Sequence, residues 1–527
     1  MSAVDSPQQR QPRTGEREPR GRPGASSSGL QALARSDGAV AVLACTALGI
    51  LSAAVLPTVP SYDPWSWIVW GREIFDPHLS FVVNGGPSWK PLPVIFTAVW
   101  SLFGAAAPTL WVITARIGGL LGLWGVWRLT SRLSGGGWLG AFAGALAAFG
   151  IVLTGRVDQA WYYYFLHGTS ESMLIGLTAW AVDGALEGRH LRAFVLGAAA
   201  GLIRPEFWPF LGVYAVWLWL RVDGFRRPWV VALLLAGLAA QPFGWFVPPW
   251  ITTGHPFLAA THAHDYNGHL GSDVLRSIVV RGIRDQQLPA LVLAIVAVVI
   301  GWVRDRDRRI VALGLGALAW WAVVIAETLD GYPGLERFFL PGATVICVLG
   351  GVGLAQLAAL GGAAVARVQG GARGGARPGG GALAAIASGA VAVALGAACV
   401  PFARAQLRVV RADQRNATQG VWLLDELSRA VAAVGGHRGV LPCLSSFAAI
   451  NHSAQTALAW KLQVTLERIG TTMHAPGVDF IGPHSAQTGG PAPIDPRLTR
   501  ARLLAVVGPW RVVQLTDPRL PPTCVGD

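Results

Sequence analysis

The sequence has few charged residues, and this scarcity limits the classes of protein that it can encode. Only 13% of the 527 residues are charged, whereas 52% are hydrophobic. A chain of this length would ordinarily form several soluble domains. Here, repeated apolar runs of about 18 residues or more are each long enough to cross the hydrocarbon core of a bilayer. The composition therefore excludes a purely soluble protein and predicts many membrane spans.

Acidic residues are scarcer than basic ones, with 29 Asp and Glu against 42 Lys and Arg and a formal net charge of +13. A basic excess can indicate nucleic-acid binding. In this chain the positive residues lie mainly in short loops between apolar runs, which is the distribution that orients a membrane protein. We therefore expect a lipid bilayer as partner and no nucleic acid.

Cysteine is also rare, with five residues in the chain. Cys45, Cys347 and Cys399 fall inside apolar runs, so we expect them to be small core residues. Cys443 and Cys524 lie in the C-terminal tail. If that tail is outside the cytoplasm, the two can form a disulfide, and two free thiols fit the sequence equally well.

Several motifs are missing as well. We find no convincing internal repeat, which disfavours a transporter built from duplicated halves. The Gly-rich stretch 361–381 has no strand before it and no Lys-Ser/Thr after it, so it predicts a flexible cytoplasmic linker and no phosphate-binding loop. Glycines inside the preceding apolar run instead predict close helix packing; they are Gly350, Gly351 and Gly353.

The loop 251–287 is rich in histidine, but its spacing matches no known metal motif. The residues concerned are His255, His262, His264, Asp265 and His269. We therefore predict no metal ligands and no cofactor; the alternative is a divalent metal bound by His-x-His with the nearby Asp.

About eleven apolar runs predict transmembrane helices, near 39–60, 110–130, 137–155, 168–186, 190–204, 206–221, 229–250, 288–303, 310–327, 338–357 and 382–402. The run at 91–107 is shorter and starts with two prolines, so we interpret it as an interfacial helix. With this assignment the Arg-bearing loops all fall on the cytoplasmic side. Segments 61–109, 156–167, 251–287, 328–337 and 403–527 are then extracytoplasmic.

The predicted fold is a mainly α, polytopic membrane protein with a small C-terminal α/β extracytoplasmic domain. Residues 1–38 are expected to be a disordered basic cytoplasmic N-terminus, 39–403 the transmembrane domain, and 404–527 the small domain. In that domain, 411–434 predicts a surface helix, and GVLPCL, LLAVV and RVVQL predict short strands.

The segment 61–93 combines acidic, basic, Trp and Pro residues directly after the first apolar run. Asp63 lies at the expected membrane boundary, where a carboxylate can accept a proton from an incoming hydroxyl. The alternative is a helix-end residue before Pro64. Lys90 is a candidate phosphate contact in the same segment.

Other charged residues are expected at the same boundary. Glu171 lies just inside a span, where an ionisable group is costly, so it is either a site residue or a buried structural acid. Arg204 and Glu206 stand at a tight junction of two spans, and Arg337 precedes an aromatic span. These three residues are either substrate or phosphate contacts, or interfacial residues and Arg–Glu pairs that stabilise helix ends.

The order of these features resembles the GT-C class of membrane glycosyltransferases. A first helix is followed by Asp63, an amphipathic stretch ending Gly-Arg-Glu-Ile, Trp-Lys-Pro-Leu-Pro at 89–93, and Ala-Arg-Ile at 115–117. The pattern looks most like the branch of protein O-mannosyltransferases and lipid A aminoarabinose transferases, and a late Arg-aromatic-Leu-Pro segment around Arg337 is similar too. The resemblance implies a polyprenyl-phosphate sugar donor, transfer outside the cytoplasm, and a catalytic loop at 61–109.

The resemblance also implies that Asp63 is the base of an inverting transfer. Many members of that branch have an acidic pair at this position, but here the second residue is Pro64. Glu73 or Asp76 can supply a compensating acid, so Glu73 is a candidate substrate contact. Heavy use of Ala, Gly and Arg favours a bacterial protein and therefore a cell-envelope acceptor. The protein itself is expected in the plasma membrane. A lipid-linked glycan transporter and a non-catalytic assembly scaffold stay open as alternatives.

Overall fold

The computed structural model describes residues 26–76, 79–81, 86–265, 273–371, 380–443, 446–472, 476–483 and 500–516. The chain divides into two compact units, Met1–Ala44 and Cys45–Asp527. Helix α1 (Ser26–Val55) begins well before residue 39, where the first apolar run starts. Of the N-terminal stretch predicted to be disordered, residues 1–25 lie outside the described residues.

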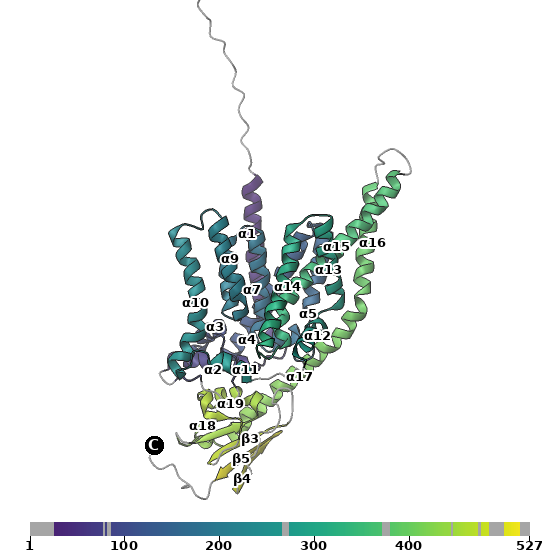
Figure 1. Cartoon of the computed structure of the whole chain (residues 1–527). Helices are drawn as coiled ribbons and strands as arrows, with labels where there is room; N and C mark the ends of the chain where they lie inside the picture. The colour runs from purple at the N-terminus through teal and green to yellow at the C-terminus, as the bar shows by residue number, and fades with distance from the viewer. Residues whose placement is uncertain are drawn as a thin grey trace, which may run out of the picture. The chain divides into compact units, whose positions relative to one another are not determined.

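Every apolar run that predicted a span forms a helix, and many of these helices run side by side (Figure 1). Besides α1 they are α4 (Ala107–Leu133), α5 (Gly137–Val152), α7 (Ser170–Leu186), α8 (His190–Gly201), α9 (Trp208–Arg221), α10 (Pro228–Thr253), α13 (Leu288–Val303), α14 (Arg308–Leu329), α15 (Leu340–Gly371) and α16 (Gly380–Ala398). Among the described residues, six helices are long and apolar enough to cross a membrane, or up to seven if the bent pair α12 (Val274–Asp285) and α13 is one span. A mainly helical polytopic fold is confirmed, and the number of eleven spans stays a prediction.

Glycine lets two pairs of these helices approach closely. A Cβ atom placed on Gly122 of α4 would lie 2.9 Å from the backbone nitrogen of Gly176 in α7. On α15, a Cβ atom on Gly353 would lie 2.0 Å from the carbonyl oxygen of Leu293 in α13. Small residues at such contacts bring helix backbones together without a bulky side chain between them. The close packing predicted for the glycines near residue 350 is therefore confirmed.

The segment after α1 forms two short helices, α2 (Tyr62–Glu73) and α3 (Pro91–Ser101). The eleven residues of α3 rise about 16 Å, which is roughly half of the hydrocarbon core. The helix is thus too short to span, as the sequence predicts. It packs on α2, where a Cβ atom on Gly71 would lie 2.4 Å from Oγ1 of Thr97.

In the second half of the chain one prediction is wrong, and one predicted helix is confirmed with an earlier start. Residues 361–371 are not a flexible linker, because α15 continues through them to Gly371. The surface helix predicted for 411–434 is α17 (Val400–Ala433), which begins earlier and follows α16 with only Cys399 between them. Alanine and arginine favour helix strongly, so the apolar run and the amphipathic one join almost without a break.

The C-terminal region contains a five-stranded sheet in the order β2-β1-β3-β5-β4. Parallel strands β1 (Phe447–Ile450) and β2 (Ile469–Gly470) are joined by a connection that includes α19 (Gln455–Leu462), so the predicted α/β character is confirmed. Strands β3 (Gly477–Ile481), β4 (Arg500–Val507) and β5 (Trp510–Thr516) complete the sheet. β4 and β5 contain the predicted LLAVV and RVVQL strands and are joined at Gly508, whose φ of +52° suits glycine.

The strand predicted for GVLPCL is wrong. Its first residues end the short helix α18 (Gly436–Val440), and Leu441–Cys443 belong to no strand. Proline at position 442 has no N–H to give to a strand ladder, which explains the failure. Cys443 takes part in a disulfide, whereas Cys45, Cys347 and Cys399 are free thiols. Cys524, the partner that the sequence suggests, lies outside the described residues.

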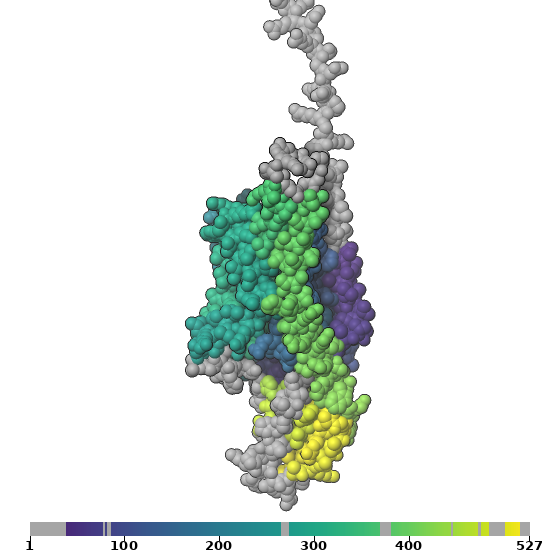
Figure 2. Space-filling model, turned by 90° about the vertical axis from the view of Figure 1, so that its right-hand side faces the viewer, coloured from purple at the N-terminus to yellow at the C-terminus, as the bar shows by residue number. Residues whose placement is uncertain are grey.

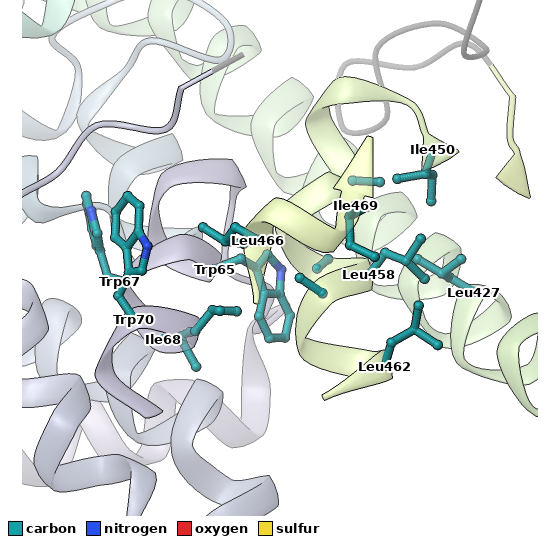
Figure 3. Close-up of a cluster of buried hydrophobic side chains, with 14 of the residues drawn as sticks. Trp65, Trp67, Ile68, Trp70, Leu427, Ile450, Leu458, Leu462, Leu466 and Ile469 are labelled. Atoms are coloured by element: carbon teal, nitrogen blue, oxygen red, sulfur yellow. The ribbon is translucent and has the colours of Figure 1, made fainter. Parts of the chain in front are cut away.

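Helix α2 packs against the C-terminal domain. Trp65, Trp67, Ile68 and Trp70 of α2 belong to one hydrophobic cluster with residues of the domain, and Figure 3 shows α2 beside the helices and strands that supply them. The contributing side chains of the domain include Leu427, Ile450, Leu458, Leu462, Leu466 and Ile469. The hydroxyl of Tyr62 also donates a hydrogen bond to Oε1 of Gln455, at 3.0 Å. The domain therefore fixes the position of the helix that carries Asp63.

Candidate functional site

Six of the seven predicted site residues come together and form what we call the charge cluster: Asp63, Lys90, Glu171, Arg204, Glu206 and Arg337. They stand in or directly before the first turns of α2, α3, α7, η2 (Pro205–Phe207) and η3 (Glu336–Phe339). A helix that starts at the cluster leads the chain away from it, so residues distant in sequence meet where these helices begin. The remaining predicted residue, Glu73, lies elsewhere.

Asp63 lies in the first turn of α2, where the free N–H groups of a helix favour a carboxylate. Its Oδ2 atom pairs with Nη1 of Arg337 at 3.1 Å, and Oδ1 accepts a hydrogen bond from the backbone N–H of Ser88 at 3.2 Å. The carboxylate is thus held from two sides. Pro64 follows in the same turn, a position that proline tolerates because no helical hydrogen bond is lost there.

Glu171 links Lys90 to Arg204. Its Oε1 atom accepts from Nζ of Lys90 at 2.9 Å and from Nη2 of Arg204 at 3.0 Å. Arg204 also pairs through Nη1 with Oε1 of Glu206 at 3.0 Å. Glu171 is fully buried, and the other three are at most 5% exposed. Buried charges are costly unless paired, so this chain of contacts offsets the cost of burying the four side chains together.

Two donors in the cluster have no partner among the described residues. They are the Nε atoms of Arg204 and Arg337, both shielded from solvent. A buried N–H without an acceptor costs free energy, so such groups usually have a partner when the protein works. A phosphate oxygen in contact with either Nε atom would satisfy it, which makes this part of the cluster a candidate phosphate site.

Aromatic rings lie against the cations of the cluster. Nζ of Lys90 lies 5.2 Å from the ring centre of Trp67, and the guanidinium of Arg204 lies 4.3 Å from that of Phe338. Burial lowers the pKa of Lys90 to about 8; Glu171 acts in the opposite direction, and the nearby arginines lower the pKa further. Lys90 is thus a cation at neutral pH that can lose its proton under mildly basic conditions.

Arg116 of α4 holds the backbone that frames the cluster. Although fully buried, it donates to the carbonyl oxygens of Pro57, Phe165 and Leu166 at 2.5, 3.1 and 3.1 Å. These carbonyls belong to the chain before α2 and to the short helix α6 (Trp161–Leu166). The sequence contains Arg116 in its Ala-Arg-Ile motif, but only the long-range contacts reveal this bracing role.

Glu73 lies at the far end of α2, about 15 Å along the helix axis from Asp63. It pairs with Arg72, which also donates to Oε1 of Gln463 and to the carbonyl of Val464 in the C-terminal domain. Burial raises the pKa of Glu73 to about 7, because its Oε2 atom has no partner among the described residues and Arg72 offsets only part of the cost. The structure therefore does not bring Glu73 into the charge cluster.

Two further polar residues, Asp158 and His264, also lie outside the cluster. Asp158 contacts α17, where Asp413 accepts from its backbone N–H at 2.9 Å and Asn416 donates to its Oδ1 atom at 3.2 Å. His264, in α11 (Leu258–Asp265), packs on Tyr332 with ring centres 4.4 Å apart. His269 and the side chain of Asp265 fall outside the described residues, so the prediction that no metal binds here stays a prediction.

Comparison with known proteins identifies a solved structure of similar fold. No family model and no curated protein match the sequence. Among solved structures, the crystal structure of ArnT from Cupriavidus metallidurans bound to undecaprenyl phosphate is similar, with a TM-score of 0.50 and 14% sequence identity. The match covers 90% of this chain and 97% of that one. The chain therefore has an ArnT-like polytopic fold, as the resemblance to GT-C transferases implies.

Proposed function

We propose that this protein is a glycosyltransferase that moves a sugar from a polyprenyl-phosphate carrier to a cell-envelope acceptor at the extracytoplasmic face of the plasma membrane. The observation that carries the proposal is the pair of buried, unpartnered Nε donors on Arg204 and Arg337 in a cluster that also holds Asp63. The ArnT structure of similar fold contains undecaprenyl phosphate, which supports a lipid phosphate as the ligand of these donors.

In the proposed reaction, Asp63 takes the proton of the acceptor hydroxyl. The hydroxyl oxygen forms a bond to the anomeric carbon, while the bond from that carbon to the carrier phosphate oxygen breaks. The electron pair of the broken bond stays on the phosphate, which leaves as polyprenyl phosphate with one more negative charge. Attack opposite to the leaving group inverts the anomeric centre. Among the described residues each oxygen of Asp63 has one hydrogen-bond partner, which leaves a lone pair on each for the proton.

The cations of the cluster have a matching role. Negative charge grows on the carrier phosphate as the glycosidic bond breaks, and fixed donors placed there lower the barrier. Arg204 and Arg337 each keep an Nε donor that has no partner among the described residues, and Lys90 adds a third positive charge. A phosphate monoester is a good leaving group at neutral pH, so the proposal needs neither a general acid nor a metal.

The disulfide at Cys443 supports the proposed side of the membrane. Disulfides persist in oxidising compartments and are rare in the cytosol. Cys443 belongs to the domain that packs on α2, and α2 carries Asp63, so the charge cluster and the disulfide belong to the same side. A reporter fused to the C-terminus should therefore be extracytoplasmic, and a cytoplasmic signal would contradict this placement.

One observation favours a non-catalytic scaffold as the second candidate. Lys90, Arg204 and Arg337 each already have a carboxylate partner in the structure. Such pairs also fit a purely structural role, in which they stabilise the fold and take no part in a reaction. An assay for the release of polyprenyl phosphate separates the two functions, because a scaffold would release none from any donor.

The proposal can be tested with the full-length protein in lipid nanodiscs and a panel of polyprenyl-phosphate sugars, with release of polyprenyl phosphate as the readout. Arg204→Lys and Arg337→Lys keep the positive charge but remove the Nε donor. We expect each to slow release by roughly 10- to 100-fold, the scale of one lost charge-assisted hydrogen bond. Arg281→Lys, on the nearby helix α12, serves as control. Full release by both variants would remove the phosphate site from the mechanism.

A comparison of envelope glycans with and without the protein would identify the acceptor. A single missing sugar residue would name both the transferred group and its attachment point. Unchanged glycans in cells that lack the protein would contradict the proposed activity and leave the scaffold.

A further inference from the structure

A cleft of about 620 Å³ opens between α6 and α17, away from the contacts of the charge cluster. It is lined by Tyr162 of α6 and by Arg408, Val410, Arg411, Gln414 and Arg415 of α17. We call it the arginine cleft. Its volume is in the range of about 300 to 1,000 Å³ that small-molecule sites occupy.

The three arginines give the cleft a strong positive charge. At positions 408, 411 and 415 they are spaced three and four residues apart, so they share one face of the helix. Their side chains are exposed, and no ion pair involving them occurs within the described ranges. The nearest acid along the helix, Asp413, is fully buried and accepts from the backbone of Asp158. The positive charge is therefore not cancelled locally.

The far wall of the cleft is fixed by a side-chain contact. The hydroxyl of Tyr162 donates to Oε1 of Gln414 at 2.5 Å, which links α6 to α17. Tyr163 and Tyr164 follow in α6, and burial raises the pKa of both above the usual range, with a smaller contribution from Asp63 to Tyr163 and from Glu171 to Tyr164. One short helix thus separates the arginine cleft from the candidate active site.

The position of α17 indicates what kind of molecule can reach the cleft. The helix follows α16, a candidate span, after Cys399 alone, and runs obliquely away from it (Figure 1). Phe402 and Leu407, in its first turns, are 42% and 37% exposed. Figure 2 shows α16 and α17 as a green ridge on the face toward the viewer. Apolar side chains followed by arginines mark the boundary between acyl chains and headgroups.

We propose that the arginine cleft binds the phosphate of an anionic lipid headgroup. Three unpaired guanidinium groups suit phosphate oxygens, and each basic residue near a membrane surface adds about 1 kcal/mol to the binding of anionic lipid. The exposed apolar residues beside the cleft would contact the acyl chains of the same lipid. This binding does not depend on the proposed sugar transfer.

The test uses the full-length protein in nanodiscs of phosphatidylcholine with increasing fractions of phosphatidylglycerol. Native mass spectrometry counts the phosphatidylglycerol molecules retained by the protein. We expect R408Q/R411Q/R415Q to bind the retained lipid roughly 100-fold more weakly than the unmodified protein. R404Q/R438Q/R511Q removes the same charge at exposed positions outside the cleft and is expected to retain the lipid. R408K/R411K/R415K keeps the charge and should retain most of the binding, so it separates lost binding from lost folding.

A second arm distinguishes a lipid from a soluble phosphate compound. Soluble glycerol phosphate is added at the same concentration as phosphatidylglycerol. We expect no displacement of the lipid, because the soluble compound lacks the acyl chains that contact Phe402 and Leu407. Displacement would overturn the lipid assignment. Equal retention by the Gln variant and the unmodified protein, or equal loss in the control variant, would overturn the site itself.

Discussion

The two ends of α2 hold acidic side chains in opposite surroundings. At its start, Asp63 accepts from Arg337 and from the backbone of Ser88, so both of its oxygens have a partner. At its end, Glu73 is buried with one oxygen paired to Arg72 and the other unpartnered in the described structure. The same helix thus offers the charge cluster a carboxylate held by two donors, and at its other end a carboxyl whose pKa burial raises to about 7. The difference shows that neighbours decide the chemistry of a carboxyl group more than its helix does.

The largest effect is expected at the Asp63 end. Asp63→Asn keeps the shape and the contact to Ser88 but cannot accept the proton of the acceptor. We expect the rate of sugar transfer to fall by about 10²- to 10⁴-fold, the range of a general base. Asp330→Asn, which changes an exposed acid in a neighbouring loop, is the matched control. A normal rate of transfer by Asp63→Asn in nanodiscs would show that Asp63 is not the base.

Glu171→Gln tests whether the charge cluster also supports the fold. The change leaves Lys90 and Arg204 buried with one fewer anionic partner, which costs about 3 to 5 kcal/mol for a broken buried pair. We expect a lower melting temperature by tryptophan fluorescence. Glu467→Gln, at an exposed position, should leave the melting temperature unchanged. A Glu171→Gln protein as stable as the unmodified one would show that the cluster contributes little to stability.

The pH dependence of transfer tests Lys90. Its pKa is lowered to about 8, so its positive charge is present below pH 8 and is lost as pH rises through that value. We expect kcat/KM to fall by roughly tenfold per pH unit above this point. Lys90→Arg should remove that limb, because a guanidinium stays charged. An identical alkaline limb in Lys90→Arg would assign it to another group.

The smallest effect is expected at the Glu73 end. The pKa of Glu73 rises to about 7 in the folded protein, above the unfolded value of 4.5. Its contribution to stability is therefore fully present below pH 4.5 and is lost as pH rises to about 7. Glu73→Gln should lessen the fall in melting temperature over this range and leave transfer unchanged. Asp413 and Asp479, whose pKa values burial also raises to about 7, act in the same direction in both proteins, so the difference reports Glu73 alone.

Much of the fold could be predicted from the sequence, because hydrophobic runs determine helices locally. A helix forms at each apolar run that predicted a span, and α3 is short, as Pro91 and Pro93 at its start suggested. Helix ends were harder to place. The Ala-rich and Gly-rich stretch 361–371 contains no proline, and Pro401 stands in the first turn of α17, where proline is tolerated, so α15 and α17 extend beyond their predicted bounds.

The charge cluster could be predicted in part for a related reason. Asp63, Glu171, Arg204 and Arg337 stand out because an ionisable residue beside an apolar run is rare and costly. Which of them meet could not be read from the sequence, since their pairing depends on helix packing across long separations. Glu73 shows the limit. Glu73 belongs to the same polar, Trp-rich segment as Asp63, yet it lies at the other end of α2.

Helix α17 also has a mechanical consequence. Its 34 residues extend about 50 Å, from Cys399 beside the last candidate span to the sheet, where Trp510 donates to the carbonyl of Leu423 at 2.9 Å. A rod of that length magnifies small rotations, since a tilt of about 5° at one end moves the other by roughly 4 Å. A change in bilayer thickness that tilts α16 would therefore move the C-terminal domain. Because this domain packs on α2, Asp63 would shift with it.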